Sequence, residues 1–195
     1  MPFLDHFGII APYYDRWFRS TQTDNLRLCL DLPVSGLVLD VGGGTGRVSQ
    51  QLKGMAASFV VADESLGMLR QALHKDNLAP VCTSAERLPF TNGLFDRIMM
   101  VDALHHVLDY QQTAGELWRV LKIGGKIVIE EPDIRKLTIK LVALAEKLLL
   151  MRSQFLSAYE IGCLFPYPQA TIRVEQDRHT VWVVIDKTGE VSDAN

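Results

Sequence analysis

A turn rich in glycine is the feature of this sequence that points most directly to chemistry. The stretch "LVLDVGGGTGRVSQQL", from Leu37 to Leu52, places four glycines in five positions between a strand-like apolar run and a helix-like run. Glycine permits positive φ angles and lets the backbone approach a ligand closely. Asp40 ends the strand-like run, and its carboxylate would oppose a pyrophosphate but attract an ammonium or a sulfonium group. The stretch therefore predicts a turn that binds a small cationic molecule.

A dinucleotide-binding loop is the main alternative for such a turn, and it requires the pattern G-x-G-x-x-G. Counted from Gly42, the third glycine position is occupied by Arg47. Counted from Gly43, the second glycine position is occupied by Thr45, and no Tyr-x-x-x-Lys sequence occurs in the chain. The pattern therefore disfavours a nicotinamide-dependent oxidoreductase. A turn without any ligand is disfavoured as well, because four flexible residues would cost about 0.5–1 kcal/mol each without a use.

The elements that must position this turn alternate between short apolar runs and longer helical patterns, which predicts a parallel sheet covered on both faces. Two further runs within 170–187 are joined by only a few polar residues, too few for a parallel crossover, so we expect an antiparallel hairpin at the sheet edge. The predicted fold is a Rossmann-like, doubly wound α/β fold with a seven-stranded, mostly parallel sheet. The other expected strands are Leu37–Val41, Phe59–Asp63, Ala79–Cys82, Ile98–Val101 and Lys126–Glu130, and the expected helices are Arg47–Met55, Ser65–Lys75 and Tyr110–Leu121.

The composition is that of an ordinary globular domain. The 195 residues are 48% hydrophobic and 22% charged, and the formal net charge of −3 creates no field that would attract nucleic acid or an anionic membrane. The three cysteines lie far apart without a C-x-x-C pair, so we expect neither a disulfide framework nor a metal site. The amino terminus lacks a signal-peptide pattern, and no apolar run reaches the roughly 18 residues of a membrane span. We therefore expect one cytoplasmic domain over residues 1–195.

Several segments, in order, resemble the class I S-adenosylmethionine-dependent methyltransferases. Motif I of that family is similar to "VLDVGGGTG", and its second-strand acid with the following helix is similar to "VVADESLGMLRQA". The adenine-contact turn and fourth strand resemble "TSAERLPFTNGLFDRIMMVDALHHV", and the helix–GG–strand segment resembles "ELWRVLKIGGKIVIEEPD". The lead-in "IAPYYDRW" is similar to that of the ubiquinone/menaquinone biosynthesis C-methyltransferases. The resemblance extends from about Tyr13 to Lys187 and also implies the terminal antiparallel hairpin.

The resemblance implies an S-adenosylmethionine site at the carboxyl ends of the strands. Asp40 would reach the amino group of the cofactor, directly or through water. Asp63 would accept both ribose hydroxyls, and a role as a helix N-cap is the alternative. The glycine backbone would pass under the methionine part of the cofactor. The glycines expected to do so are Gly42, Gly43, Gly44 and Gly46.

The adenine contacts depart from the family pattern at two positions. Ser84, Ala85 and Glu86 should border the adenine, although many relatives carry Asp in place of Ser84. A Ser hydroxyl accepts a hydrogen bond from the exocyclic amine more weakly than a carboxylate does. Glu64 stands where the family usually has an apolar residue, and its aliphatic stem would cover the adenine instead. Tyr14 would donate to the cofactor carboxylate, close over the site, or simply pack with its neighbour.

Two adjacent histidines are the candidates for catalysis. "VDALHHVLD" places His105 and His106 just past the fourth strand, on the rim where a methyl acceptor should lie. If the acceptor is a phenol, a hydroxyl or an acidic carbon, a His base assists near neutral pH. A structural histidine that caps the nearby turn is the alternative for each of them. Asp102 either stands beside the methyl-donor end of the cofactor or bonds the backbone of the turn.

The acceptor side is expected from helices within 132–168, and a lead-in or lid from residues 1–30. One apolar stripe on a helix of this segment is expected to lie in the hydrophobic core. A second apolar set would cover an apolar acceptor pocket, contact the second subunit of a homodimer, or lie buried within the domain. The stripe is Leu137, Leu141, Leu144, Leu148, Met151 and Phe155, and the second set is Ile139, Val142, Leu149 and Leu150.

The expected function is therefore transfer of a methyl group to a small apolar or aromatic metabolite. A nucleic-acid methyltransferase is disfavoured, because "VDALHHV" contains no Asn/Asp-Pro-Pro-aromatic turn, there is no Pro-Cys nucleophile, and the chain is acidic. A cofactor-binding sensor or subunit without its own activity stays open as the second alternative.

Overall fold

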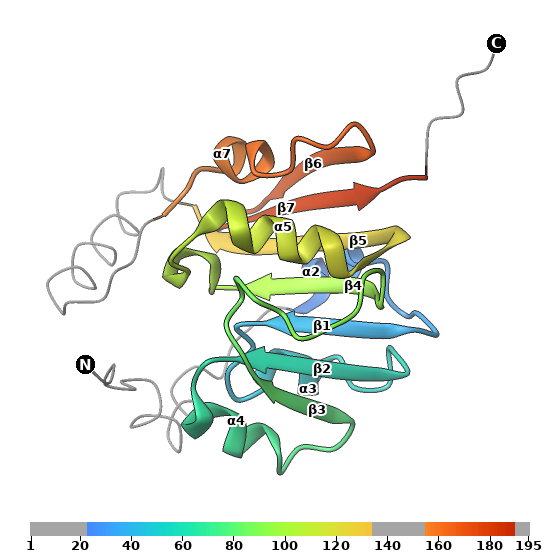
Figure 1. The fold of residues 1–195 in the computed structure, drawn as a ribbon, viewed down its shortest axis with the longest axis vertical. Coiled ribbons are helices and arrows are strands. Elements are labelled where there is room, and N and C mark those ends of the chain that lie inside the picture. Colours follow the sequence, from blue (N-terminus) through green and yellow to red (C-terminus); the bar gives the residue numbers. More distant parts are fainter. Residues whose placement is uncertain (1–22, 134–154, 190–195) are drawn as a thin grey trace, which may run out of the picture.

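Seven strands form one sheet in the part of the chain that the computed structural model describes, residues 23–133 and 155–189 (Figure 1). Their order is β3-β2-β1-β4-β5-β7-β6; neighbours from β3 to β5 are parallel, and β7 is antiparallel to both β5 and β6. The expected mostly parallel sheet with a C-terminal antiparallel hairpin is confirmed. The strands are β1 (Leu37–Val41), β2 (Ser58–Asp63), β3 (Leu78–Cys82), β4 (Phe95–Val101), β5 (Leu121–Pro132), β6 (Ala170–Gln176) and β7 (Thr180–Lys187).

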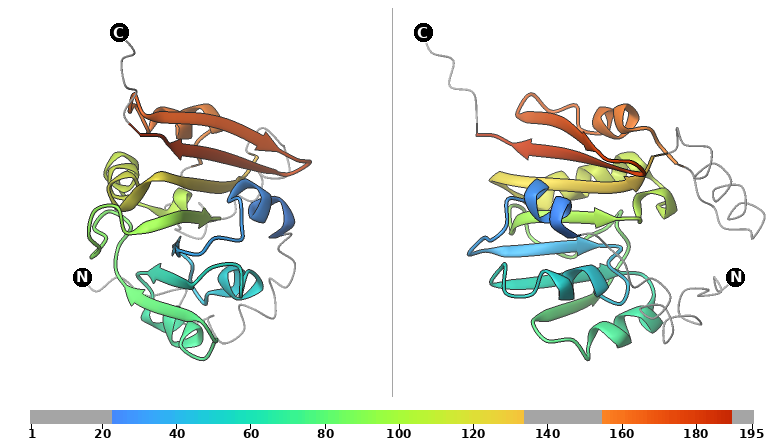
Figure 2. Two further views of the ribbon diagram at one scale, coloured as in Figure 1. Left: turned by 90° about the vertical axis from the view of Figure 1, so that its right-hand side faces the viewer. Right: turned by 180° about the vertical axis from the view of Figure 1, so that it is seen from behind.

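Helices cover both faces of this sheet. The α5 and α7 helices lie on the face toward the viewer in Figure 1, whereas α2 and α3 lie on the opposite face, seen from behind in Figure 2. Each face has its own buried cluster, which includes Leu117 and Ile161 on the first face and Leu26 and Val48 on the second. The helices of the described residues are α2 (Thr23–Cys29), α3 (Arg47–Gln51), α4 (Leu66–Ala72), the 3-10 helix η1 (Leu104–His106), α5 (Tyr110–Val120) and α7 (Ala158–Cys163).

The elements differ from the predicted ones at their ends. The helix expected to reach Met55 ends at Gln51, and the helix expected to reach Leu121 ends at Val120. Strand β5 begins immediately after that helix, because the expected helix–GG–strand connection is itself part of the strand. Gly124 makes this possible with a φ of 76°, a conformation that residues with side chains rarely adopt.

Some predicted features lie outside the described residues. These are the lead-in with Tyr14, the second apolar set of the acceptor-side segment, and all of its core stripe except Phe155. Their roles stay predictions.

The carboxyl ends of the five parallel strands meet at one edge of the sheet, on the left of Figure 1. Val41 at the end of β1 pairs with Ala62 of β2, and Val101 at the end of β4 pairs with Glu130 of β5. The segments that follow these positions are therefore neighbours in space. They are the glycine turn, Asp63, η1 and the last residues of β5, and ligands of open α/β sheets bind at this edge.

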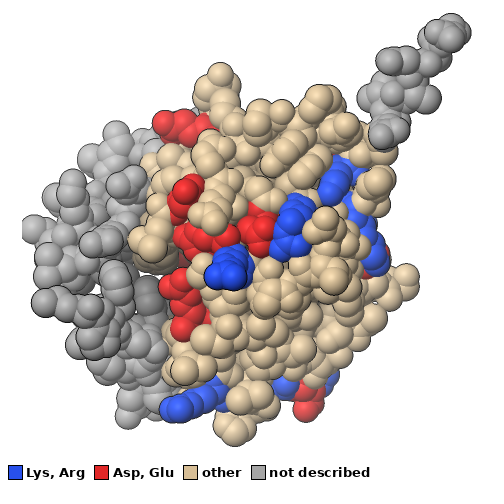
Figure 3. Space-filling view, in the orientation of Figure 1, with Lys and Arg blue, Asp and Glu red and all other residues tan. Residues whose placement is uncertain are grey.

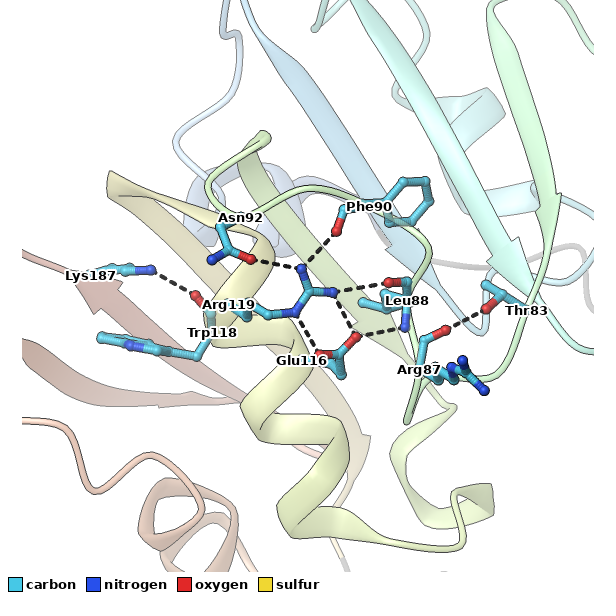
Figure 4. A network of polar contacts seen from close by, with 9 residues as sticks. All are labelled: Thr83, Arg87, Leu88, Phe90, Asn92, Glu116, Trp118, Arg119 and Lys187. Atoms are coloured by element: carbon cyan, nitrogen blue, oxygen red, sulfur yellow. Dashed lines mark hydrogen bonds and ion pairs between the residues drawn. The ribbon is translucent and has the colours of Figure 1, made fainter.

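The loop between β3 and β4 is fixed to α5 by one arginine (Figure 4). Arg119 donates to the carbonyls of Leu88 and Phe90, at 3.0 and 2.7 Å, and to Oδ1 of Asn92 at 2.9 Å. Glu116 pairs with Arg119 at 2.6 Å and accepts the N–H of Leu88 at 2.8 Å. Because this loop starts at the binding edge, the arginine holds one wall of the edge in place.

Arg119→Ala should lower the free energy of unfolding by about 1.5–3 kcal/mol, the usual contribution of hydrogen bonds to a charged group. Urea unfolding followed by circular dichroism measures the change. Arg173→Ala is the matched control, because Arg173 pairs with Asp186 at an exposed position of β6 at 2.9 Å, where such pairs contribute about 0–1 kcal/mol. Equal losses in the two variants would contradict the role of Arg119.

Candidate functional site

The turn after β1 has positive φ angles at three of its glycines. The values are 70° at Gly42, 54° at Gly44 and 70° at Gly46. A Cβ on Gly42 would lie 2.5 Å from Cβ of Ala103, and a Cβ on Gly46 would lie 2.5 Å from Leu78. Glycine is therefore required at these two positions both by conformation and by the close approach of neighbouring segments.

Gly44 differs from the other glycines of the turn because a Cβ there would fit without a clash. The nearest atoms to a Cβ at this position would be Oδ2 of Asp63 and the side chain of Met68, at distances of 3.9–4.0 Å. The space next to Gly44 can therefore take a ligand against the backbone.

Asp63 at the end of β2 holds the turn in this shape. Its Oδ2 accepts the N–H of Gly44 at 2.8 Å, and its Oδ1 accepts the N–H of Ser65 at 2.8 Å. The N-cap of α4 is Ser65, whose hydroxyl accepts the N–H of Met68, so the alternative N-cap role expected for Asp63 is filled by another residue. A carboxylate oxygen can accept more than one hydrogen bond, so Asp63 can hold the turn and also accept hydroxyl groups of a ligand.

Asp40 lies beneath the turn and is only 1% exposed. Its Oδ2 accepts the hydroxyl of Ser49 at 2.7 Å, and a Cβ on Gly43 would lie 2.5 Å from its carboxylate. Burial raises the pKa of Asp40 to about 7, against the lowering effect of the Ser49 hydrogen bond, and the charge of Asp63 raises it further. A cation above the turn would favour the ionised carboxylate.

The residues expected at the adenine form a connected group. Ser84 donates its hydroxyl to Glu86 at 2.8 Å, and Glu86 accepts the N–H groups of Leu108 and Asp109 at 2.8 and 3.3 Å. Burial acts to raise the pKa of Glu86, but these hydrogen bonds outweigh it and lower the pKa. Glu86 thus ties the loop after β3 to the segment before α5.

Two other expected residues lie in the same region. Ala85 packs partly buried against the cluster that includes Leu117. Burial raises the pKa of Glu64, and the charges of Glu86 and Asp63 raise it further, so the three carboxylates are close enough to interact. In Figure 3, acidic side chains gather toward the edge where the parallel strands end. This edge suits a cationic ligand better than a phosphate.

The two histidines lie beside the glycine turn. They belong to η1, and the contact of Ala103 with Gly42 places the start of η1 directly against the turn. Their ring centroids are 4.0 Å apart with the planes inclined by 50°, so the rings contact each other rather than diverge. His105 also stacks on Phe155 at 4.3 Å. Burial, and then the charge of His105, lower the pKa of His106 to about 4.

Asp102 occupies a left-handed backbone conformation between β4 and η1, with a φ of 50°. Its N–H donates to the carbonyl of Glu130 at 2.9 Å, and its charge contributes to a raised pKa of that glutamate. The main chain of Asp102 therefore takes part in turning the chain from β4 toward η1. Such a strained residue at the end of a strand is common at functional sites.

Two residues of the site were not predicted. Ser49 is the hydrogen-bond partner of Asp40, and Glu131 binds His105 at 2.6 Å. The sequence "IVIEEPD" carried a signal for Glu131, because an acidic pair at the end of a buried strand must turn one carboxylate to each face. The signal does not identify the partner, which comes from another strand end.

Within the described ranges, no helix combines the length and the apolar character needed to cross a bilayer. The same residues contain no group of three or more His, Cys, Asp or Glu side chains arranged to hold a metal ion.

Comparison with known families and sequences identifies relatives over the central part of the chain. Residues 39–129 match the model of a methyltransferase domain. The chain is 36% identical over 137 residues to a demethylmenaquinone methyltransferase of Mycolicibacterium vanbaalenii. The aligned region covers 70% of this chain and 57% of that protein. The chain is also 34% identical over 104 residues to a ubiquinone/menaquinone biosynthesis C-methyltransferase of Hahella chejuensis, covering 48% and 42%. The chain spans about half the length of the curated relatives it matches.

Solved structures share the fold. A SAM-dependent methyltransferase of Thermotoga maritima has a TM-score of 0.76 at 20% identity, over 93% of this chain and 98% of that one. The DhpI–SAH complex has a TM-score of 0.73 at 16% identity, over 95% of each chain. At these identities the likeness establishes the Rossmann-like methyltransferase fold.

The raised pKa of Asp40 predicts an unusual pH dependence of stability. The folded state keeps the proton up to a pH of about 7, whereas an unfolded Asp loses it near pH 4. Stability from this group is therefore present at low pH and is lost as the pH rises through this window. Relative to Asp40→Asn, which can still accept the Ser49 hydroxyl, the wild-type free energy of unfolding should fall by up to roughly 1.4 kcal/mol for each pH unit between about 4 and 7.

Urea unfolding at a series of pH values measures this difference. Asp76→Asn is the control. The hydrogen bond from Lys53 lowers the pKa of Asp76, so the wild-type free energy of unfolding relative to Asp76→Asn should not fall as the pH rises from about 4 to 7. A pH-independent difference between wild type and Asp40→Asn would contradict the buried environment of Asp40.

Proposed function

We propose that the protein transfers the methyl group of S-adenosylmethionine to a small apolar or aromatic metabolite, because residues 39–129 match a methyltransferase domain and the chain is similar to named methyltransferases. The observation that carries the proposal is the glycine turn after β1, whose Gly44 N–H donates to Asp63 and which lies at an acidic edge of the sheet. The relatives are a demethylmenaquinone methyltransferase and a ubiquinone/menaquinone biosynthesis C-methyltransferase, which supports an acceptor with a ring.

The residues of the turn fit the cofactor. The glycine backbone would pass under its methionine part, and Asp63 would accept the ribose hydroxyls while it holds the turn. Because Gly43 covers the carboxylate of Asp40, we favour a contact of Asp40 with the ammonium group through water. Ser84 and Glu86, with their neighbours Ala85 and Glu64, would border the adenine. Asp102 would lie beside the methyl-donor end, and Tyr14 would close over the site.

S-adenosylmethionine supplies a methyl group on a positively charged sulfur, and this charge disappears on transfer. Alignment of donor and acceptor in a pocket without bulk water therefore supplies much of the catalysis. In this chain, the backbone at Gly44 and the carboxylate of Asp63 would fix the donor. The histidines of η1 would then stand at the acceptor.

The acceptor side offers a small apolar space. A cavity of about 250 Å³ lies between the end of β5, the start of α7 and β7, lined in part by Pro132, Leu156 and Val181. Leu156 follows Phe155, which stacks on His105, and Pro132 follows Glu131, which binds His105, so two lining residues are sequence neighbours of residues that contact the histidine. Its size and lining support a small apolar or aromatic acceptor rather than a nucleic acid.

We also propose a single domain that acts in the cytoplasm. The three cysteines, Cys29, Cys82 and Cys163, are all free thiols, which suits a reducing compartment. A homodimer would be formed through the acceptor-side segment, whose second apolar set lies outside the described residues.

The proposal is tested by incubating the purified protein with methyl-labelled S-adenosylmethionine and a fractionated small-molecule extract. We expect one labelled product that partitions into an organic phase, and mass spectrometry identifies its acceptor. Binding of the cofactor without transfer to any fraction would favour a non-catalytic sensor or subunit. Transfer to RNA or DNA with a steep salt dependence would favour a nucleic-acid methyltransferase.

Gly44→Val should abolish binding of S-adenosylmethionine, because the new side chain occupies the space where the ligand meets the backbone. Isothermal titration calorimetry measures the affinity. Gly54→Val is the matched control, since Gly54 has a φ of 83° and nothing within 4 Å of the position of a Cβ. It imposes comparable backbone strain away from the site and should keep the wild-type affinity. Unchanged affinity in Gly44→Val would place the cofactor elsewhere.

A further inference from the structure

A buried glutamate and a buried histidine are paired at the acceptor side of the site. Glu131 is 3% exposed and His105 is 5% exposed. Oε2 of Glu131 lies 2.6 Å from Nδ1 of His105, and Oε1 accepts the N–H of Leu104 at 2.8 Å. Both oxygens of the carboxylate are therefore used to hold η1 at the end of β5.

This pairing determines which nitrogen of His105 carries the proton. An ionised Glu131 would only accept hydrogen bonds, so Nδ1 of His105 would be the donor and Nε2 would be the unprotonated, basic nitrogen of the neutral ring. Phe155 stacks on one side of the ring with the planes inclined by 18°, and His106 contacts it as well. The orientation of the ring and its tautomer are thus both set by the surroundings.

The neighbouring groups distinguish His105 from His106. Burial, and then the charge that His105 carries when it is protonated, lower the pKa of His106 to about 4, so His106 remains neutral at physiological pH and accepts a proton poorly. Burial, and then the charge of Glu131, raise the pKa of Tyr110 on α5, which keeps the phenol neutral. Glu131 is the carboxylate partner of His105 and would stabilise its imidazolium.

We propose that Glu131 and His105 form the general-base pair of the methyl transfer, with His105 as the base and Glu131 as the residue that positions it and stabilises its charge. The inference rests on the proposed function and deepens it. Two contacts of η1 support the proposal. Leu104 and His105 bond to Glu131, and the preceding Ala103 lies against Gly42, so the pair lies beside the glycine turn.

The proton and electron balance of the step is complete without another reactant. Nε2 of His105 takes the proton of an O–H, N–H or acidic C–H bond of the acceptor. The electron pair released on the acceptor forms the bond to the methyl carbon, and the pair of the broken carbon–sulfur bond stays on sulfur. The positive charge thereby passes from the donor to the imidazolium of His105, next to Glu131, and the proton is later released to water.

Glu131→Gln tests the role of the carboxylate. The Leu104 N–H requires an acceptor, so the amide oxygen of the substituted side chain would have to face Leu104, and its NH₂ group would face His105. That arrangement forces Nδ1 to accept a hydrogen bond from the amide, so the ring proton moves to Nε2. A protonated Nε2 cannot take a proton from the acceptor. We expect kcat to fall by about 10²–10⁴-fold with little change in the KM for S-adenosylmethionine, and the acidic limb of the pH–rate profile to be lost.

Glu130→Gln is the matched control on the same strand. Glu130 is also buried, and its carboxylate accepts from Nε1 of Trp182 at 2.6 Å, in the core of the opposite face. This variant should keep the wild-type kcat and pH profile. Glu131→Asp, which retains the charge, should recover part of the activity lost in Glu131→Gln.

Nitrogen-15 NMR of the histidines in the protein without cofactor gives a readout that does not depend on activity. The wild type should show His105 with the proton on Nδ1, and Glu131→Gln should show it on Nε2. A wild-type signal from Nε2–H, or a Glu131→Gln variant with the wild-type kcat and pH profile, would overturn the pair. If the wild type transferred no methyl group, the proposed function would fail, and the pair would have no catalytic role. NMR would still show in that case whether Glu131 and His105 are paired.

Discussion

The binding edge of this protein depends on a backbone bend that neighbouring strands hold from both sides. Strand β1 lies between β2 and β4, so the turn after it meets Asp63 on one side and Ala103 on the other. Asp63 accepts the N–H of Gly44, and Ala103 fills the space that a side chain on Gly42 would need. The parallel register thus joins segments distant in the sequence into one preorganised cradle.

Carboxylates at this edge have different properties because their surroundings differ. Asp40 is buried under the turn, and burial raises its pKa to about 7. Glu86 is partly buried too, but hydrogen bonds from a hydroxyl and from backbone N–H groups lower its pKa. The edge therefore combines a group that is ionised at neutral pH with one whose charge a bound cation would favour. This combination suits a sulfonium or ammonium ligand and disfavours a phosphate.

The walls of the site are rigid because each loop is anchored to a regular element. Glu86 binds the N–H groups at the start of α5, and Arg119 of the same helix binds the carbonyls of the loop between β3 and β4. Glu131 anchors η1 in the same manner from β5. Loops tied by charged hydrogen bonds keep their geometry with less reorganisation when a ligand binds.

The sequence by itself determined the sheet, the glycine turn and the acids at the strand ends, because these depend on local periodicity and on the conformational freedom of glycine. The strand β1 was predicted with its observed bounds, and the hairpin followed from the length of its connection. Pairings between strand ends were decided by the tertiary structure alone. Asp63 with Gly44, Asp40 with Ser49 and Glu131 with His105 depend on register and on side-chain packing. No local pattern encodes such distances, because each pair forms only when the folded sheet brings separate segments of the chain together.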